Sequence, residues 1–281
     1  MNTFLRRLQI EEIACLHSAF LSAVFDPPTL SDLQAAEHPA FQRIRDQLKP
    51  QRVMLAGGVA ILPVHGALAR KPDPFEMLFY GVEDSTAVLQ MIQDAARDPE
   101  VLGAVLDVDS PGGMVTGGLE VSDAVAAMES VKPVVAWSGG LMASMGYHIG
   151  ARAGTVTASR SAQIGSIGTV ISWLDVTERM KAMGLSPVTF VSKDADLKRA
   201  GAPGSPLTDE QKAYFQARVD GAAAEFHRAV EEKRGKLSAE AKRGGMHFAE
   251  DAKKIGLVDS VGPREWAIDL LKRQIKSRTK G

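Results

Sequence analysis

Three glycine-rich stretches each follow a short apolar run, and they hold the residues whose types and spacing could do chemistry. They are residues 109–113 (Asp-Ser-Pro-Gly-Gly), 138–147 (Ser-Gly-Gly-Leu-Met-Ala-Ser-Met-Gly-Tyr) and 164–168 (Ile-Gly-Ser-Ile-Gly). Glycine pairs let backbone N–H groups approach a ligand without interference from a Cβ atom, so such loops can bind a phosphate or a developing oxyanion. None of the three has the P-loop or dinucleotide-binding pattern. Phosphate binding is therefore disfavoured, while tight strand-to-helix turns without a ligand stay an open alternative.

Ser144 is the candidate nucleophile of these stretches. It stands at the start of a predicted helix over residues 143–153, between the small residues Ala143 and Gly146. A serine there presents its hydroxyl to the glycine-rich loops, and the first amides of the helix face the same place. An attacking Oγ and an oxyanion hole belong in such a position.

A serine nucleophile needs a base, and the residues alone do not decide which one it is. His148 lies four residues after Ser144, but its ring would run down the side of the helix, which is more typical of a core histidine. A desolvated lysine can also accept the proton of a serine. The chain has many lysines, and spacing does not choose among them.

Alternating strands and helices must position these loops. Apolar runs predict strands over 59–64, 101–108, 133–137 and 155–158, and helical spacing predicts helices over 84–97, 117–129 and 143–153. This alternation indicates an α/β fold with βαβ units and a mostly parallel sheet. Ligands gather at the carboxyl ends of such strands, where the glycine-rich loops stand. Further predicted elements are a strand over 188–191, a long helix over 208–234 opened by Thr208, and short helices over 238–244 and 248–254.

The two ends of the chain are predicted to be accessory elements. Apolar residues between Ile10 and Val24 recur at helical spacing, which predicts an amphipathic docking helix, and residues 27–52 read as a linker. The predicted terminal helix over 263–278 is basic, which is typical of a solvated helix end whose charges complement its dipole. A contact with nucleic acid is the less favoured interpretation.

The overall composition excludes several classes of protein. The 281 residues carry 33 Lys and Arg against 34 Asp and Glu, a net charge of −1, so a globally basic nucleic-acid binder is excluded. The single cysteine, Cys15, cannot form an internal disulfide or a cysteine-rich metal site. No run approaches the roughly 18 apolar residues of a membrane span, and no secretory signal is expected.

A family resemblance adds to this reading. Residues 109–113, 143–147 and 164–170, with 60–66 before them, resemble the signal peptide peptidase A (protease IV) family of Ser-Lys peptidases, in that family's order and spacing. Within the family they most resemble the head-maturation (prohead) proteases of tailed phages. The resemblance runs from about residue 57 to 262 and implies a ClpP/crotonase-like fold. We expect an N-terminal helix and linker over 1–52, the peptidase domain over 53–262 and a basic C-terminal helix over 263–281.

The resemblance also implies roles for individual residues. The catalytic serine falls on Ser144 and the general-base lysine on Lys198, with Lys193 as the rival. The serine that orients the lysine falls on Ser166. The oxyanion donors fall on the backbone N–H groups of Gly113 and Met145, and the family implies no metal and no cofactor.

The implied function is that of a serine endopeptidase that cleaves capsid or scaffold proteins. Members of the family form rings, so a homo-oligomer (a tetramer or octamer) is expected, in the host cytoplasm or procapsid, without nucleic acid or a membrane span. The alternatives are a signal peptide peptidase-like protease, a crotonase-type acyl-CoA enzyme and an inactive assembly subunit.

Overall fold

The computed structural model describes residues 14–16 and 49–278 of the chain. Its centre is a six-stranded sheet of order β13-β10-β8-β6-β3-β2, in which every neighbouring pair is parallel except β2 and β3. Its strands are β2 (Val53–Leu55), β3 (Val59–His65), β6 (Gly103–Asp109), β8 (Val134–Ser138), β10 (Thr155–Ala158) and β13 (Ser260–Val261). The predicted α/β class with a mostly parallel sheet is confirmed.

Each of four long strands is followed by a short strand that leaves the central sheet. The short strands are β4 (Ala67–Ala69), β7 (Gly112–Met114), β9 (Leu141–Ala143) and β11 (Gln163–Gly165). They form two small sheets of order β1-β7-β4-β5 and β12-β11-β9, completed by β1 (Ala14–Leu16), β5 (Val82–Asp84) and β12 (Met246–Phe248). This repeat of long strand, short strand and helix is the ClpP/crotonase-like arrangement that the resemblance implies. Each glycine-rich stretch thus contributes residues to a short strand, because its backbone pairs although its side chains show no strand pattern.

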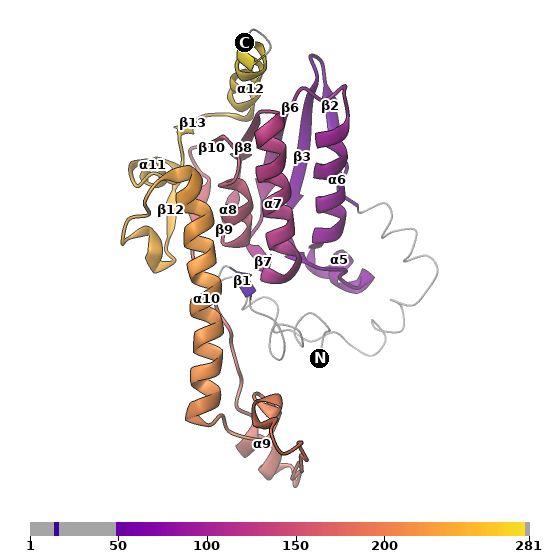
Figure 1. Ribbon diagram of the computed structural model, residues 1–281, viewed down its shortest axis with the longest axis vertical. Helices are drawn as coiled ribbons and strands as arrows, with labels where there is room; N and C mark the ends of the chain where they lie inside the picture. Colours follow the sequence, from indigo (N-terminus) through magenta and orange to yellow (C-terminus); the bar gives the residue numbers. More distant parts are fainter. Residues whose placement is uncertain (1–13, 17–48, 279–281) are drawn as a thin grey trace.

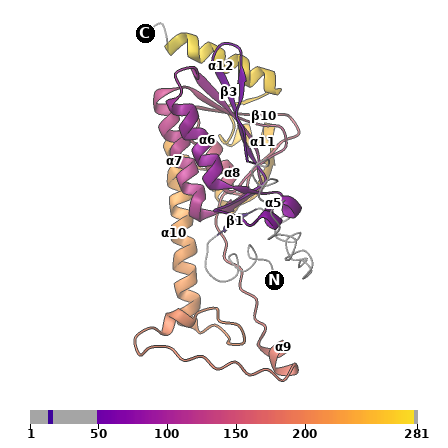
Figure 2. The ribbon, with the colours of Figure 1, turned by 90° about the vertical axis from the view of Figure 1, so that its right-hand side faces the viewer.

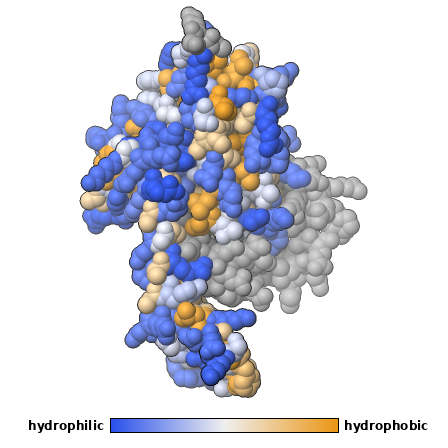
Figure 3. Space-filling view, in the orientation of Figure 1, coloured by the Kyte–Doolittle hydropathy of each residue, from blue (hydrophilic) through white to orange (hydrophobic). Residues whose placement is uncertain are grey.

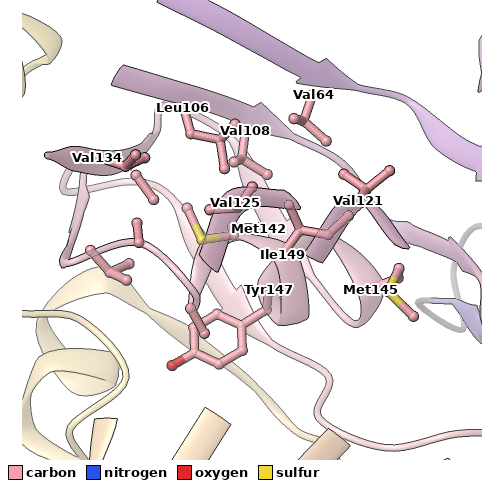
Figure 4. Close-up of a cluster of buried hydrophobic side chains, with 14 of the residues drawn as sticks. Val64, Leu106, Val108, Val121, Val125, Val134, Met142, Met145, Tyr147 and Ile149 are labelled. Carbon is pink, nitrogen blue, oxygen red and sulfur yellow. The ribbon is translucent and has the colours of Figure 1, made fainter. Parts of the chain in front are cut away.

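Helices cover both faces of the central sheet (Figures 1 and 2). One face packs against α6 (Ser85–Arg97), α7 (Val115–Val131) and α8 (Met145–Gly150), through a core that includes Val64, Leu106, Val125 and Ile149 (Figure 4). The opposite face packs against α12 (Arg264–Arg278), through Val59, Ile61 and Val105 with Leu271 of the helix. Side chains of one strand alternate between the two cores, which explains the unbroken apolar runs in the sequence.

Tyr147 shows how α8 is held in this core. Its ring is fully buried, and its hydroxyl donates a hydrogen bond to the carbonyl oxygen of Leu257 at 3.0 Å. Burial raises the pKa of the Tyr147 hydroxyl far above its ordinary value, so it stays protonated and remains a donor. The helix that follows Ser144 is thereby anchored through its own side chain.

The other helices are the long α10 (Asp209–Arg234) and the short α5 (Pro74–Tyr80), α9 (Thr177–Ala182), η1 (Asp196–Arg199), η2 (Ala241–Arg243) and α11 (Ala249–Lys254). Thr208 is the N-cap of α10, and it exchanges hydrogen bonds with Gln211, each 3.2 Å long, in a reciprocal capping box. The predicted start of this helix is therefore confirmed. The predicted short helix over 238–244 is reduced to the single turn η2.

Residues 171–207, called the arm below, extend away from the core at the foot of α10 (Figures 1 and 2). They include α9 and η1. Thr169 ties the base of the arm to α10 by donating a hydrogen bond from its hydroxyl to the carbonyl oxygen of Val219 at 2.7 Å. Within the arm, the Trp173 indole donates to the carbonyl oxygen of Gly201 at 3.1 Å, so the arm has its own packing.

Two sequence predictions are wrong in this structure. Residues 188–191 form no strand, because they lie exposed on the arm without a neighbouring strand to pair with. The predicted amphipathic helix between residues 10 and 24 lies largely outside the described residues, and its three described residues form strand β1 instead. The predicted linker over 27–52 also lies outside them as far as residue 48, and the predicted domain boundaries stay predictions. No helix in the described ranges is long and apolar enough to cross a membrane.

Candidate active site

The three glycine-rich stretches meet at one place through backbone hydrogen bonds. Ser110 donates its N–H to the carbonyl oxygen of Leu141 at 2.7 Å, and Ala143 donates to the carbonyl oxygen of Ser110 at 3.0 Å. Ser144 in turn donates its N–H to the carbonyl oxygen of Gly165 at 2.8 Å. The strands β7, β9 and β11 therefore hold their ends side by side, with Ser144 between them.

Ser144 has a backbone conformation that few residues other than glycine adopt. Its φ is 52° and its ψ is −121°, and it is the N-cap of α8. The positive φ turns the chain sharply from β9 into the helix, which lifts the serine side chain out of the strand. Such strain costs about 1–3 kcal/mol and persists where the surroundings enforce it, commonly at functional sites. A nucleophilic serine on a strained strand-to-helix turn is a recurrent catalytic device.

The small residues around this turn allow the close packing that it needs. A Cβ atom at Gly146 would lie 3.0 Å from the Cβ of Ser110, tighter than ordinary van der Waals contact. Glycine at this position therefore lets the first turn of α8 approach the loop before β7. This explains why Ser144 is followed two residues later by a glycine.

The hydroxyl of Ser144 is buried and has no hydrogen-bond partner among the described residues. The residue is 1% exposed, and its Oγ lacks both a donor and an acceptor within reach. Native proteins rarely leave a buried hydroxyl unpaired, because the lost hydrogen bond to water costs free energy. The site is therefore organised for a partner that the described part of the chain does not supply.

Gly113 lies in β7, where there is no room for a side chain. A Cβ atom there would lie 2.2 Å from the carbonyl oxygen of Leu68 and 2.6 Å from its nitrogen. Met145 is the first residue of α8, and the first amides of a helix have no carbonyl partner within the helix. These are the two backbone groups that the family resemblance implies as oxyanion donors, and the structure brings their elements, β7 and α8, into contact.

Two side chains that sequence reasoning did not single out hold β7 and β9 in place. The buried Ser110 donates its hydroxyl to the carbonyl oxygen of Gly66 at 2.6 Å and accepts the N–H of Gly112 at 3.1 Å. Asp109 accepts the N–H of Leu141 through Oδ1 at 3.0 Å. Both residues belong to the Asp-Ser-Pro-Gly-Gly stretch, so their signal was present, but only the fold shows which backbone groups they bind.

The Met145 side chain points into the core. It is 1% exposed, and a Cβ atom on Gly118 of α7 would lie 2.7 Å from its Cγ and Sδ atoms (Figure 4). Only the backbone of Met145 is thus available at the nucleophile. The methionine fixes α8 against α7 and leaves the substrate side to other residues.

Ser166 follows β11 directly and lies beside Ser144 in the fold. Gly165 pairs with Ala143 in the parallel register of β11 and β9. Ser166 directly follows Gly165 and Ser144 directly follows Ala143, so the two serines leave neighbouring strands at the same level. Ser166 also has a positive φ, of 54°, and donates its N–H to the carbonyl oxygen of Gly245 at 2.9 Å. Its side chain lines a cavity of about 670 Å³ together with residues of α10 and the segment 242–246.

His148 is a core residue in this structure. Its Nδ1 lies 2.8 Å from Ser122 Oγ, and its ring packs on Phe226 with 4.8 Å between ring centroids. Burial lowers the pKa of His148 to about 4, so the ring is neutral near pH 7. The interaction with Ser122, and not with Ser144, supports the interpretation of His148 as structural.

The structure does not bring either candidate lysine to Ser144. Lys198 lies in η1, Lys193 lies shortly before it, and both side chains are exposed on the arm. Figures 1 and 2 both show this part of the chain at the far end of α10, away from β9 and α8. Of the predicted site residues, the fold thus brings together Ser144, Ser166, Gly113 and Met145, and it leaves Lys198 apart.

Comparison with known families identifies the family to which the chain belongs. The profile named Peptidase_S49 (peptidase family S49) matches residues 126–278, which is more than half of the chain. The chain belongs to peptidase family S49. The matched S49 segment includes Ser144, Ser166 and Lys198. The predicted relationship to the signal peptide peptidase A family is confirmed.

Individual S49-type relatives come from cellular organisms and from phages. The chain is 32% identical over 194 residues to MJ0651 of Methanocaldococcus jannaschii, whose name describes it as a candidate protease; the alignment covers 68% of this chain and 62% of that protein. It is 27% identical over 235 residues to capsid assembly protease C of Escherichia phage lambda, over 83% and 52% of the two chains. It is 33% identical over 190 residues to protease 4 of Salmonella typhi, and this alignment covers 66% of the present chain and 30% of that protein.

The S49 chain described here therefore matches between about a third and three fifths of the length of these relatives. Among solved structures, a crystal structure of an enoyl-CoA hydratase/isomerase family member is similar with a TM-score of 0.43 and 17% identity, over 81% of this chain and 74% of the other.

Proposed function

We propose that this chain is a serine endopeptidase in which Ser144 is the nucleophile and Lys198 the general base. The observation that carries the proposal is the conformation of Ser144, a positive-φ serine at a strand-to-helix turn whose buried hydroxyl has no hydrogen-bond partner within residues 14–16 and 49–278. Membership in peptidase family S49 supports it. The histidine closest in sequence, His148, is committed to Ser122.

The proposed reaction proceeds through an acyl-enzyme. The neutral amine of Lys198 accepts the proton of Ser144 Oγ while the oxygen attacks the scissile carbonyl carbon. The N–H groups of Gly113 and Met145 donate hydrogen bonds to the resulting oxyanion, and one such donor is worth about 3–4 kcal/mol in the transition state. The charged lysine then protonates the leaving amine, and water hydrolyses the ester. Ser166 donates a hydrogen bond that orients the lysine.

Lys198 reaches Ser144 from a second copy of the chain in this proposal. The arm that carries it is rich in exposed apolar side chains, which a lone chain would leave in water (Figure 3). They include Met183, Leu185, Val188 and Phe190, of which Phe190 is 93% exposed. An apolar surface of this kind is typical of a protein contact. Burial of the arm on a neighbour would also remove Lys198 from water, and a desolvated lysine can accept the proton of a serine.

The substrates we propose are the capsid or scaffold proteins of a phage, cleaved in the host cytoplasm or the procapsid by a ring of identical chains. Two relatives are phage proteins: capsid assembly protease C of phage lambda, and the head-tail preconnector protein GP5 of Enterobacteria phage P21, 26% identical over 237 residues. Incubation with candidate capsid and scaffold proteins, followed by mass spectrometry of fragments, tests this part. Signal peptides are incubated in parallel, and fragments obtained only from these peptides would favour the signal peptide peptidase interpretation.

Subunit mixing tests the catalytic pair. Ser144→Ala and Lys198→Met should each abolish hydrolysis of a peptide substrate, while Lys193→Met should retain it. When the two inactive variants are mixed and reassembled, some sites combine an intact Ser144 with an intact Lys198 of a neighbour, so a fraction of the wild-type activity should return.

The outcomes of this experiment separate the parts of the proposal. Full activity of Ser144→Ala would overturn the peptidase mechanism. Loss of activity in Lys193→Met with retention in Lys198→Met would give the role of base to Lys193. Inactive single variants that regain nothing on mixing would show that both residues act within one chain.

A further inference from the structure

Strand β1 lies on the edge of β7, next to the candidate active site. The two strands are antiparallel, and Ala14, Cys15 and Leu16 stand opposite Met114, Gly113 and Gly112. In the order β1-β7-β4-β5, β4 closes one side of β7 and β1 closes the other. The segment opposite the predicted oxyanion donor Gly113 is therefore a part of the same chain, almost 100 residues earlier in the sequence.

This edge of β7 is where a polypeptide substrate must lie if Ser144 acts on it. The residues just before β7 and just before Ser144 are hydrogen-bonded to each other, since Ala143 donates its N–H to the carbonyl oxygen of Ser110 at 3.0 Å. A carbonyl carbon within reach of Ser144 Oγ, with its oxygen at Gly113, places the chain that carries it alongside β7. An extended peptide commonly binds in this way, by adding a strand to an exposed sheet edge.

We propose that the segment Ala14–Leu16 is an intramolecular inhibitor that occupies the substrate's strand site on β7 and must leave before a substrate can bind. The proposal rests on the function proposed above. One edge of a strand can pair with one partner only, because its N–H and C=O groups are used once in a ladder. The occupant and a substrate are therefore mutually exclusive.

The covalent link makes this segment an effective competitor although only three residues pair. A tethered segment acts at an effective concentration of the order of millimolar, without any contribution from its concentration in solution. A substrate at lower concentration must wait for the edge to open. The shortness of β1 keeps the pairing reversible, so a displacing partner or substrate can release the site.

Two substitutions in the full chain test the occupancy. Cys15→Pro removes the N–H of the central residue of β1 and restricts its φ, so the ladder with Gly113 should be lost. Cys15→Ala keeps the backbone donor and is the matched control. Hydrogen exchange of those amides of residues 112–114 that point toward β1 should be slow in the wild type and in Cys15→Ala, and at least about tenfold faster in Cys15→Pro because the covering strand is gone.

Two reagents that modify serine test the inhibition. A peptidyl phosphonate needs the edge of β7, so its rate of reaction with Ser144 should rise at least about threefold in Cys15→Pro, as the fraction of open sites rises. A small sulfonyl fluoride needs no strand site, and its rate should be similar in all three proteins. Ser144→Ala should react with neither reagent.

A reversible cross-link provides an independent variant. In the Cys15→Ala background, Ala14→Cys with Met114→Cys places two cysteines at opposite positions of an antiparallel pair, where the Cα separation of roughly 4.5–5.5 Å suits a disulfide. The oxidised chain should resist the peptidyl phosphonate, and reduction should restore the reaction.

The results distinguish failure of this inference from failure of the proposed function. Equal peptidyl rates in Cys15→Pro and Cys15→Ala would overturn the inference alone, as would unprotected amides at 112–114 in the wild type. Absence of any reaction at Ser144, with both reagents and in every variant, would overturn the peptidase function and the regulation together.

Discussion

Ser144 donates its backbone N–H to the carbonyl oxygen of Gly165 at 2.8 Å, so the candidate nucleophile is held by the last residue of β11, directly before Ser166. Both serines have positive φ values, 52° and 54°. Ser144 directly follows Ala143 of β9, and Ser166 directly follows Gly165 of β11, and these two strand residues are paired with each other. A change of register in this short pair would therefore move the two hydroxyls together. The geometry of the site depends on backbone pairing more than on contacts between its side chains.

The strain at Ser144 should be measurable as stability. A positive φ destabilises the folded state by about 1–3 kcal/mol for a residue with a Cβ atom. Glycine avoids this strain, but its greater freedom in the unfolded chain offsets about 0.4–1 kcal/mol of the stability gained. We expect the free energy of unfolding of Ser144→Gly, measured by urea denaturation, to be about 1 kcal/mol higher than that of Ser144→Ala. Both variants lack the hydroxyl, so their difference isolates the Cβ atom. An alanine variant at least as stable as the glycine variant would contradict the strain argument.

Gly113→Ala should damage catalysis. The new Cβ would lie 2.2 Å from backbone oxygen of Leu68, so β7 must shift and the Gly113 N–H must move with it. We expect a fall in kcat of about 100-fold or more, the usual cost of losing one oxyanion donor. Gly221→Ala is the control, because a Cβ there meets nothing within 4 Å in α10. It should leave kcat unchanged and stabilise the helix by about 0.5–1 kcal/mol; equal kcat in both variants would remove Gly113 from the mechanism.

Phe190→Ser tests the arm as an assembly element. The side chain is 93% exposed, so its loss should change the stability of the single chain by no more than about 0.5 kcal/mol. We expect the variant to dissociate on analytical ultracentrifugation and to lose peptide hydrolysis. Val131→Ser, at an exposed position 65% accessible at the end of α7, should keep both properties. A Phe190→Ser protein with wild-type assembly and activity would show that this face of the arm is not a contact.

Glu83 should make the protein less stable as pH rises. Burial raises the pKa of Glu83 to about 7, against an ordinary value of 4.5, and its buried Oε1 has no hydrogen-bond partner among the described residues. The folded state therefore holds a proton that the unfolded state has lost between pH 4.5 and 7, so stability falls through this range. The interaction with Asp107 raises the pKa of the neighbouring His65, and this group loses its stabilising proton in the same direction.

Urea denaturation at pH 5 and pH 8 measures this effect. Glu83→Gln removes the titrating carboxyl, so the wild type should lose more stability than the variant over this range, by roughly 3 kcal/mol at most. Parallel losses in the two proteins would show that Glu83 titrates normally.

The sequence predicted the central sheet and its helices well, because buried parallel strands are unbroken apolar runs and the covering helices show one apolar face. The short strands β7, β9 and β11 were not predicted. Their pairing uses backbone groups of glycine-rich segments, such as Gly112 and Gly113, that have no alternating side-chain pattern. Residues 188–191 show the opposite error, since the apolar character of Val188 and Phe190 suggested a buried strand where the single chain leaves them exposed.

The candidate site was predictable only where local sequence motifs specify it. Ser144 and Ser166 stand in local motifs that make them candidates, and the fold places them together through β9 and β11. The position of Lys198 depends on how residues 171–207 leave the core, which no local pattern specifies. The pairing of Ala14–Leu16 with β7 joins segments distant in sequence, so helical spacing near the start of the chain was misleading there.

The reach of the arm has a consequence for how such an enzyme would be controlled. In the mechanism proposed above, the base at the far end of this segment acts on another molecule, so turnover would depend on the local concentration of chains: dilute chains should be inactive, and cleavage should begin only where many copies are packed into a confined volume.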